Sequence, residues 1–415
     1  MDSLSSSPLC ASAPPHEKSV WQTKKLGDCC EVINGGTPKT GVTEYWDGEH
    51  AWVTPAEMGK RSSPYMAETA RTLTNGGMAN SSATTLPPNS VILSSRAPIG
   101  HLVINTVPMA FNQGCKGLVP ERELHYKFLY YYLFSSVDLL NSLGTGATFK
   151  ELSGGKLKEV MIPLPQLPEQ KRIVGIMDEA FEGIAKAKAL AEANLQNARA
   201  LFQSYLQSVF SQRGEGWVDR QLEDVCTIGD GNHSSNYPKK EELVAEGVPF
   251  IRAKNLVAGE ISDEDMRFLS PEKHAQLKKG HLKTGDILFT NRGEIGKTAI
   301  VDAAHDGSNL KSQIAWLRCG NLLNNRILFH VLNSGSIKSH LELAKNGAAL
   351  QQFTIRQIKA LKIPIPTKDQ QKSLVNLLDS LSEETQRLES LYQSKLDALD
   401  ELKKSLLYQA FSGNL

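Results

Sequence analysis

Two long segments of the chain carry apolar residues at alternating steps of four and three, the spacing that a coiled-coil helix requires. In the central segment the stripe begins at Ile173, and nine of its eleven positions are apolar. In the C-terminal segment it begins at Leu374, and eight of eleven positions are apolar. We therefore predict two long helices, at about 168–211 and 369–411.

The two stripes differ in side-chain size. The central stripe is rich in Ala and the C-terminal stripe in Leu, so large side chains of one helix can pack onto small side chains of the other. We expect the two helices to pair with each other in antiparallel orientation. The alternative is that each helix lies on its own domain as an ordinary amphipathic helix.

Each long segment follows a mixed region in which short apolar runs are separated by turn residues. Apolar runs predict two strands and one amphipathic helix in each region: strands 91–93 and 102–104 with helix 124–140, then strands 287–289 and 298–301 with helix 326–343. A glycine-containing turn, Arg96–Gly100, separates the first two strands, and Arg292–Gly296 separates the second two.

The same order occurs twice because the sequence itself is repeated. Trp21 returns 196 residues later as Trp217, and the turn at Arg96 returns at the same offset. The motif Ile162-Pro163-Leu164-Pro165 returns 201 residues later as Ile363-Pro364-Ile365-Pro366. Two copies of one unit in one chain mimic a homodimer and suit a target whose two halves need not match.

The repeat predicts a mixed α/β (α+β) fold. Two tandem domains would be joined by two long antiparallel coiled-coil helices and related by a pseudo-twofold axis. The expected segments are a flexible tail at 1–20, a first domain at 21–165, a central long helix at 166–213, a second domain at 214–366 and a C-terminal long helix at 367–415.

Composition places the chain among ordinary globular proteins. It has 415 residues with 40% hydrophobic and 22% charged residues, and its net charge is only +1, so a nucleic-acid partner would require cations gathered on one face. Six cysteines, none in CxxC spacing, predict buried free thiols in a reduced compartment. The first twenty residues do not read as a signal peptide and no segment is apolar enough to span a membrane, so we expect a cytoplasmic protein with no membrane partner.

The order of these parts resembles the specificity subunit of Type I restriction–modification enzymes. The residues that carry the resemblance are Trp21–Gly27, Ser94–Gly100, the stretch IPLPQLPEQKRI at Ile162–Ile173, and their counterparts in the second copy. The second copy departs slightly, with Asp369-Gln370-Gln371-Lys372 at the start of its long helix. The resemblance covers essentially the whole chain beyond residue 20.

The resemblance implies a non-catalytic subunit that reads a split target on double-stranded DNA, one half with each target-recognition domain. It implies that the long helices set the gap and dock the modification (methyltransferase) subunits, and that a restriction/translocase subunit is a further partner. S-adenosylmethionine, ATP and Mg would then belong to partner subunits, with no cofactor in this chain. The alternatives are a stand-alone DNA methyltransferase or nuclease, and a coiled-coil protein scaffold without DNA binding.

Catalytic motifs are scarce in the sequence. Neither an Asn/Asp-Pro-Pro-aromatic motif nor a GxGxxG motif occurs. The segment Asn291–Thr298 nearly spells a P-loop, but Asn291 stands where its first glycine belongs and an apolar, strand-like run follows Lys297 in place of a helix. We interpret it as a turn, and we predict no catalytic or metal-binding residue.

Candidate DNA contacts fall into three groups: a pair of arginines, a pair of glutamines, and residues in the segments where the two copies differ. Arg96 and Arg292 occupy matching turns and could contact phosphate or guanine, or could instead fix the turn or pair with a local acid. Gln113 and Gln313 carry an amide that can read adenine, or have a structural role. The copies differ most at 36–90 and 232–285, where base readers are expected. Candidates there, each also explicable as a solvated surface residue, are Lys39, Thr40, Lys60, Arg61 and Arg71 in the first copy, and Asn232, His233, Lys239, Lys240, Arg252, Lys254 and Asn255 in the second.

Overall fold

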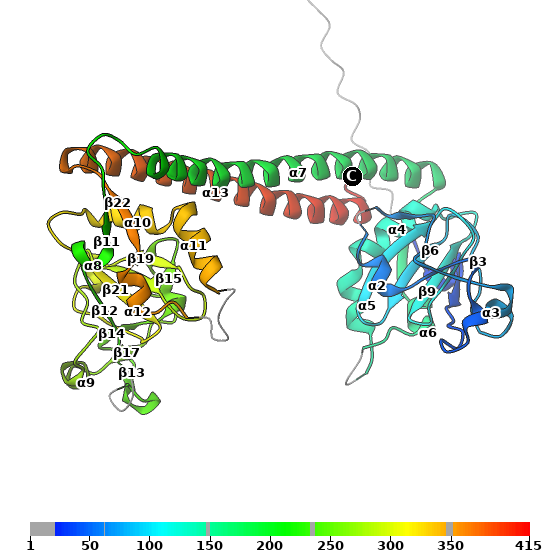
Figure 1. Cartoon of the computed structure of the whole chain (residues 1–415). Coiled ribbons are helices and arrows are strands. Elements are labelled where there is room, and N and C mark those ends of the chain that lie inside the picture. Colours follow the sequence, from blue (N-terminus) through cyan, green and yellow to red (C-terminus); the bar gives the residue numbers. More distant parts are fainter. Residues whose placement is uncertain (1–20, 62, 147–149, 233–236, 346–351) are drawn as a thin grey trace, which may run out of the picture. The chain divides into compact units, whose positions relative to one another are not determined.

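The computed structural model describes residues 21–61, 63–146, 150–232, 237–345 and 352–415. The chain forms two compact units: unit 1 contains the chain up to Leu190 together with Lys395–Leu415, and unit 2 contains Ala191–Ser394 (Figure 1). The long helices α7 (Leu167–Gln212) and α13 (Lys368–Phe411) agree with the predicted helices to within one residue at each end, and each contributes a part to both units. Within the described ranges, no helix has both the length and the apolar composition needed to cross a bilayer.

Unit 1 is built on a five-stranded sheet with strand order β2-β9-β6-β7-β4, beside a three-stranded sheet β5-β3-β8 and a ribbon of β1 with β10. The strands are β1 (Gln22–Lys25), β2 (Cys30–Asn34), β3 (Trp46–Val53), β4 (Tyr65–Met66), β5 (Arg71–Leu73), β6 (Val91–Ser95), β7 (Ile99–Asn105), β8 (Met109–Phe111), β9 (Cys115–Pro120) and β10 (Met161–Leu164). The helices are α1 (Leu26–Cys29), α2 (Pro55–Met58), α3 (Asn75–Ala79), α4 (Tyr126–Ser135), α5 (Val137–Leu143) and α6 (Gly154–Lys158).

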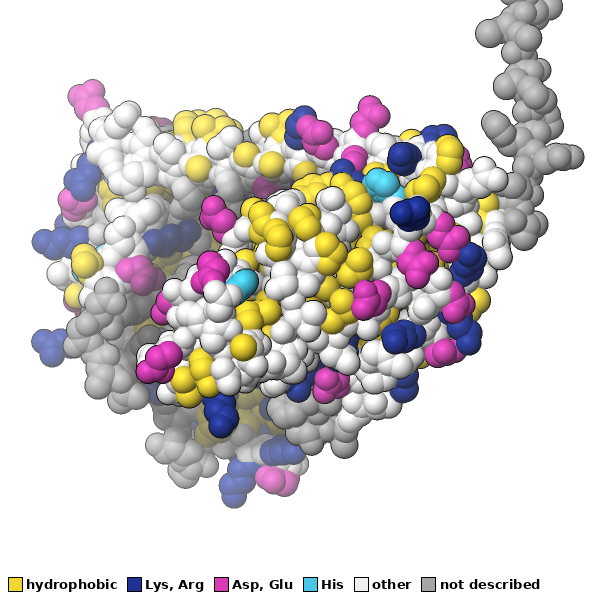
Figure 2. Space-filling model, turned by 90° about the vertical axis from the view of Figure 1, so that its right-hand side faces the viewer, with side chains coloured by type: hydrophobic (Ala, Val, Ile, Leu, Met, Phe, Trp, Pro, Cys, Tyr) yellow, Lys and Arg dark blue, Asp and Glu magenta, His cyan; other side chains and the backbone are white. Residues whose placement is uncertain are grey.

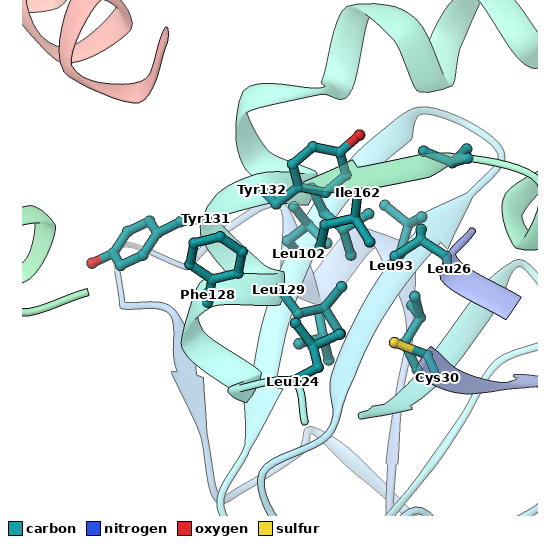
Figure 3. Packing of buried hydrophobic residues seen from close by; sticks show 14 of the residues in the cluster. Leu26, Cys30, Leu93, Leu102, Leu124, Phe128, Leu129, Tyr131, Tyr132 and Ile162 are labelled. Atoms are coloured by element: carbon teal, nitrogen blue, oxygen red, sulfur yellow. The ribbon is translucent and has the colours of Figure 1, made fainter. Parts of the chain in front are cut away.

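Strand β6 begins with the apolar run Val91–Leu93 because both faces of the central sheet are covered there. Val91 and Leu93 join a core cluster with α4, whereas Ile92, between them, joins a cluster with β3 and β8. Successive side chains of a strand point to opposite faces, so a continuous apolar run indicates cover on both sides. Figure 3 shows Leu129 of α4 packed with Leu93 and Leu102 of the sheet.

Unit 2 repeats this framework around the sheet β12-β21-β18-β19, with a second sheet β13-β17-β14-β20 and the pairs β15-β16 and β11-β22. The strands are β11 (Val218–Gln221), β12 (Cys226–Asp230), β13 (Leu243–Val244), β14 (Val248–Ile251), β15 (Leu256–Val257), β16 (Glu260–Ile261), β17 (Phe268–Leu269), β18 (Ile287–Thr290), β19 (Thr298–Ile300), β20 (Asn309–Leu310), β21 (Ile314–Cys319) and β22 (Lys362–Ile365). The helices are α8 (Leu222–Val225), α9 (Pro271–Gln276), α10 (Asn325–Leu332), α11 (Gly335–Lys345) and α12 (Ile355–Lys359).

The two predicted amphipathic helices are each broken in two, as α4 with α5 and as α10 with α11. The same hydrogen bond accompanies the break in both units. Ser135 Oγ donates to Tyr132 O at 2.7 Å, and the equivalent Ser334 Oγ donates to Val331 O at 2.7 Å. A serine hydroxyl that bonds the carbonyl of the preceding turn competes with the helical hydrogen bond and so favours a helix end at these positions.

One buried glutamine fixes the start of each long helix. Gln170 is fully buried; its Oε1 accepts from His125 N at 2.8 Å, and its Nε2 donates to Glu123 O at 2.8 Å and Pro165 O at 2.7 Å. One side chain therefore joins the first turn of α7 to the end of β10 and to the loop that leads into α4. Its amide satisfies three backbone groups that would otherwise be buried without partners.

Gln371 makes the same three bonds in unit 2. Its Oε1 accepts from Asn324 N at 2.7 Å, and its Nε2 donates to Leu322 O at 2.9 Å and Pro366 O at 3.0 Å. The Glu-Gln-Lys stretch of the first copy and the Gln-Gln-Lys stretch of the second therefore share the one residue whose side chain the framework requires.

An aspartate on each long helix joins that helix to the one that covers the sheet. In unit 1, Asp178 of α7 accepts from Lys127 Nζ and from Tyr131 OH, both at 2.6 Å. In unit 2, the equivalent Asp379 of α13 pairs with Arg326 and accepts from His330 Nε2 at 2.8 Å. The partner residues differ between the units, but the geometry of the contact is preserved.

The segments of α7 and α13 that share unit 1 run antiparallel. Near the start of α7, Arg172 donates to Leu415 O at 2.7 Å, and further along α7 Lys188 Nζ lies 2.7 Å from Asp400 Oδ1. Later residues of α7 thus contact earlier residues of α13, so the two helices are antiparallel, as the sequence predicts. In unit 2, Arg199 and Glu389 make the corresponding contact at 2.9 Å.

The buried stripe of each long helix departs from a strict heptad. In α7 the predicted Ala191 and Ala198 are buried, but Leu195 and Leu206 are buried as well, and the predicted Leu201 is 73% exposed. In α13 the predicted Leu402 is 47% exposed. An α-helix has 3.6 residues per turn, so its contact face drifts by about 20° per heptad from a 3.5-residue repeat. The prediction of a stripe is confirmed, including Ala198, but some of its later positions, such as Leu201 and Leu402, are wrong.

The two ends of the described chain meet in unit 1. Phe411 packs against Phe128 and Tyr132, with ring centroids 5.2 and 5.4 Å apart. Beyond it, a Cβ added at Gly413 would lie 3.9 Å from the ring of Trp21. In unit 2 the residues equivalent to Phe411 and Trp21 are Phe210 and Trp217. A short stretch of continuous chain joins them, and their ring centroids are 6.2 Å apart.

Replacing Gln170 with Leu should lower the free energy of unfolding of unit 1 by about 2–4 kcal/mol, because three buried backbone groups lose their partner. Hydrogen exchange followed by mass spectrometry would show faster exchange in peptides from α4 and β10. The matched control is Gln166→Leu, at an exposed glutamine just before the same helix. Equal effects of the two substitutions would contradict the role assigned to Gln170.

His330 should make unit 2 sensitive to acid. Burial lowers the pKa of His330, and Asp379 offsets this only in part, so protonation opposes folding. Its stabilising contribution is present above the unfolded-state pKa of about 6.5 and is lost as the pH falls below that value, by at most about 1.4 kcal/mol per pH unit. His330→Tyr, which installs the residue type of Tyr131, should reduce the loss of stability in urea denaturation between pH 7.5 and 5.5. The control His340→Tyr, at an exposed histidine, should not.

Candidate nucleic-acid interface

Three loops of unit 1 meet where β2 and β6 end and β9 begins; residues 35–40, 96–98 and 112–114 form what we call the three-loop cluster. Gly35 N donates to Cys115 O at 3.3 Å, and Asn112 Nδ2 donates to Thr37 Oγ1 at 2.9 Å. A Cβ added at Gly35 would lie 2.1 Å from Asn112 O, so only glycine allows the loops to approach this closely. Backbone and side-chain contacts thus hold the cluster together, and Lys39, Thr40 and Gln113 remain exposed on it.

Arg96 lies in the middle of this cluster. Its Nη1 is 3.6 Å from Glu151 Oε2, and its side chain extends over Gly114, where an added Cβ would be 3.1 Å from Arg96 Nε. The local acid that the sequence analysis offered as an alternative partner is therefore present. Both side chains are more than a third exposed, and such ion pairs are worth little. The guanidinium can exchange Glu151 for a phosphate or a base at small cost.

Lys116 is a basic residue of this site that the sequence analysis missed. It sits in β9 and is 6% exposed, and burial lowers the pKa of its ammonium group while Glu151 partly offsets the shift. Glu151 thus faces two cations, Lys116 and Arg96, which leaves a local positive charge. A lysine inside an otherwise apolar strand was the signal in the sequence that could have identified it.

The other candidates of the first copy divide between this cluster and separate elements. Lys39 and Thr40 are exposed at the end of its first loop, and Gln113 is exposed on its third. Lys60 and Arg61 follow α2, where Arg61 donates to Tyr65 O at 3.2 Å. Arg71 begins β5, and its guanidinium stacks 3.5 Å above the ring of Trp46, which holds it at the surface.

Unit 2 has an equivalent set of loops at 231–232, 291–293 and 311–313. Asn291 N donates to Gln313 O at 3.0 Å, just as Ser95 N donates to Gly114 O at 2.8 Å. Gln313 therefore occupies the place of Gly114 and not that of Gln113. The two candidate glutamines lie one position apart in the repeat, although both are near their arginine turns.

Arg292 differs from Arg96 in its acid partner. Gln352 takes the place of Glu151 in the bridge to the arginine turn, so the neighbouring carboxylate is replaced by an amide. Within the described residues, Arg292 Nε is buried and has no hydrogen-bond partner. An arginine with unused donors next to an exposed turn is well suited to bind an anionic ligand.

Two candidate amides of the second copy are occupied inside the fold. Asn232 is 4% exposed; it donates to Lys279 O at 2.6 Å and accepts from Lys279 N at 3.2 Å. Asn255 is fully buried and bonds Arg252 N, Ser262 O and Glu264 O. In this conformation both side chains stabilise loops and present no amide to a base.

The cations of the second copy are arranged in two ways. Arg252 and Lys254 both pair with Asp265, and burial lowers the pKa of Arg252. Lys239 and Lys240 are exposed at a short turn. His233 lies outside the described residues.

Among the described residues, the face in Figure 2 carries no gathered cations, and the segment that resembles a P-loop lacks the structure of one. On the face in Figure 2, Lys and Arg side chains are interspersed with Asp and Glu and form no continuous basic area. Strand β19 begins directly after Lys297, and Lys297 pairs with Glu294. The segment 291–298 is therefore a turn between strands, as interpreted, because a P-loop lysine must be followed by a helix.

Two copies of one α/β framework, each with its own inserted segment and its own arginine turn, define a tandem-domain recognition protein. Residues 18–194 and 214–396 match the family model described as Type I restriction modification DNA specificity domain, and the chain belongs to this family. The family supports a role in DNA recognition within restriction–modification complexes.

Curated relatives of the chain are named specificity subunits. The MjaIX specificity subunit of Methanocaldococcus jannaschii is 27% identical over 413 residues, covering 95% of this chain and 93% of that protein. The EcoR124I/EcoR124II specificity subunit of Escherichia coli is 31% identical over 170 residues, covering 38% and 40%.

Solved structures share the fold. A chain from the structure described as "Structural basis underlying complex assembly and conformational transition of the type I R-M system" has a TM-score of 0.78 at 19% identity, covering 98% of this chain and all of that one. The HsdS subunit from Thermoanaerobacter tengcongensis has a TM-score of 0.60 at 20% identity, covering 98% and 99%.

Replacing Arg96 with Ala should weaken DNA binding by the chain with its modification partner by roughly 5- to 150-fold if the guanidinium reads a base, and only on duplexes with the target. If it contacts phosphate, all duplexes should be affected and the salt dependence should become shallower by about one ion. Fluorescence anisotropy against salt distinguishes the two. Glu151→Gln is the control, since it frees the guanidinium and should preserve affinity. Unchanged binding by Arg96→Ala would mean that the arginine only pairs with Glu151.

Proposed function

We propose that this chain is the DNA-recognition subunit of a Type I restriction–modification enzyme and reads a bipartite target, one half with each unit. The observation that carries the proposal is a single framework that occurs twice with different inserts. Residues 36–90 supply β3 to β5 in unit 1, whereas 232–285 supply β13 to β17 in unit 2. Equal frameworks with unlike inserts suit two half-sites of unlike sequence.

Recognition is a binding step. Phosphate contacts from arginines and lysines position the protein, and base contacts from side chains near the inserts select the sequence. Arg96 and Arg292 occupy equivalent turns and are the first candidates for the positioning role. The methyl donor S-adenosylmethionine, and ATP with Mg, are assigned to partner subunits, and this chain contributes no catalytic residue.

Exposed leucines on the long helices support docking of the modification subunits. Leu190 and Leu201 of α7 are 61% and 73% exposed, and their repeat equivalents Leu391 and Leu402 of α13 are 53% and 47% exposed. In each helix the two leucines are eleven residues apart, so they share one face. Each unit carries one leucine from each helix, as expected if each unit binds one copy of the same partner.

Methylome sequencing of cells with and without this chain tests the function. One split motif should be methylated in its presence and unmethylated in its absence. An unchanged methylome would overturn the proposal. Methyl transfer or cleavage by the purified chain alone would favour the stand-alone enzyme, and failure to bind any duplex together with the modification subunit would favour the scaffold.

Leu190→Glu with Leu402→Glu should reduce co-purification of one modification subunit, because a charge would be placed in a contact that excludes water. The expected result is a change from two bound copies to one, measured by native mass spectrometry. Leu343→Glu, at a leucine 74% exposed on α11, is the control and should retain both copies. Two copies on the double variant would place the docking surface elsewhere.

A further inference from the structure

Unit 2 contains a pair of cysteines on adjacent strands of its central sheet. Cys226 opens β12 and Cys319 closes β21, and the two residues face each other directly in the antiparallel register. Their sulfur atoms are 3.8 Å apart. Both cysteines are free thiols; Cys226 is 8% exposed and Cys319 is more exposed.

The register places this pair at a position where side chains approach closely. Gly320 N donates to Val225 O at 2.8 Å, so the neighbouring pair of residues is the hydrogen-bonded one. Cys226 and Cys319 therefore form a non-hydrogen-bonded pair, in which the Cα atoms are about 4.5 Å apart. This separation falls within the range of about 4.4–6.8 Å that a disulfide accepts.

Unit 1 supplies a natural comparison. Cys30 takes the place of Cys226, and the residue opposite it in β9 is Pro120. The flanking bond from Glu121 N to Cys29 O, at 2.9 Å, matches the one in unit 2, so the two registers are the same. Only the second unit therefore has a partner thiol at this position.

The geometry points to a redox modification site in unit 2, at which Cys226 and Cys319 form a cross-strand disulfide on exposure to a low-molecular-weight disulfide. One cysteine of the pair attacks the oxidant as its thiolate and releases one low-molecular-weight thiolate, leaving a mixed disulfide. The thiolate of the other cysteine then attacks the cysteine sulfur of that mixed disulfide and releases the second. The two thiol protons pass to the two released thiolates, so one oxidant molecule is reduced to two thiols.

The bond would close a loop between residues that are 93 positions apart in the sequence. This loop contains the whole insert 232–285, so oxidation constrains the segment that distinguishes unit 2 from unit 1. The pair lies at the start of β12, whereas the equivalent loops with Arg292 lie beyond the other end of that strand. The cross-link therefore stabilises unit 2 without entering its candidate DNA-binding loops. In a reducing compartment the pair remains as thiols.

The test is incubation of the full chain with oxidised glutathione, followed by peptide mass spectrometry without reduction. We expect a linked peptide joining Cys226 to Cys319, lighter by two hydrogens than the separate peptides, while Cys30 remains a free thiol. The apparent melting temperature of unit 2 should rise by about 5 °C or more and should return on addition of dithiothreitol. Hydrogen exchange should slow in β12 and β21 and stay unchanged in β2 and β9.

Two variants sharpen the result. Cys319→Ser should abolish both the linked peptide and the stabilisation. Pro120→Cys should create the same link to Cys30 in unit 1, since the register there is identical, and its failure to link would count against the register argument. A lasting glutathione adduct on Cys319, no reaction at either cysteine, or equal oxidation of Cys30 in the unaltered chain would overturn the proposal.

Discussion

The buried glutamine at the start of each long helix is the contact on which the rest of each unit depends. An amide enclosed in a core must find partners for its oxygen and its nitrogen, and few arrangements of the surrounding backbone supply all of them. In both units the same three groups do so: the end of the Ile-Pro strand, and a carbonyl and an amide of the loop before the covering helix. The direction in which the long helix leaves the sheet is therefore fixed by hydrogen bonding and not only by packing.

This arrangement separates what must be constant from what can vary. The central sheet, the glutamine, the aspartate on the long helix and the arginine turn recur in both units, although the partners of the aspartate change from Lys127 and Tyr131 to Arg326 and His330. The inserts join the framework through strand pairing, such as the parallel pairing of β3 with β8 in unit 1 and of β14 with β20 in unit 2. They also cover one face of the central sheet, where Val53 of the first insert packs with Ile92. The exposed side of an insert can thus change while its apolar side keeps the core closed.

The sequence was sufficient for the features that depend on local pattern. Strand runs, proline stops and heptad stripes predicted the hairpin at Arg96, both long helices and the duplication. It failed where long-range geometry decides the outcome. The contact face of α7 drifts from the strict heptad beyond Ala191, so that Leu201 is exposed, because the helix keeps 3.6 residues per turn. Asn232 and Asn255 resemble exposed base readers in the sequence, yet their partners lie on loops that only folding brings near. The strand pattern could have marked Lys116 as unusual, but only the folded unit shows that it lies near Glu151.

The meeting of Trp21 with Gly413 means that the repeat is closed in space although the chain is linear. In unit 2 the same junction is a short covalent connection between Phe210 and Trp217. Residues 21 and 413 are therefore close enough in unit 1 for a connection like the one between Phe210 and Trp217. A gene that joined residue 413 to residue 21 and began instead between 213 and 216 would encode a circular permutant with the same contacts in both units.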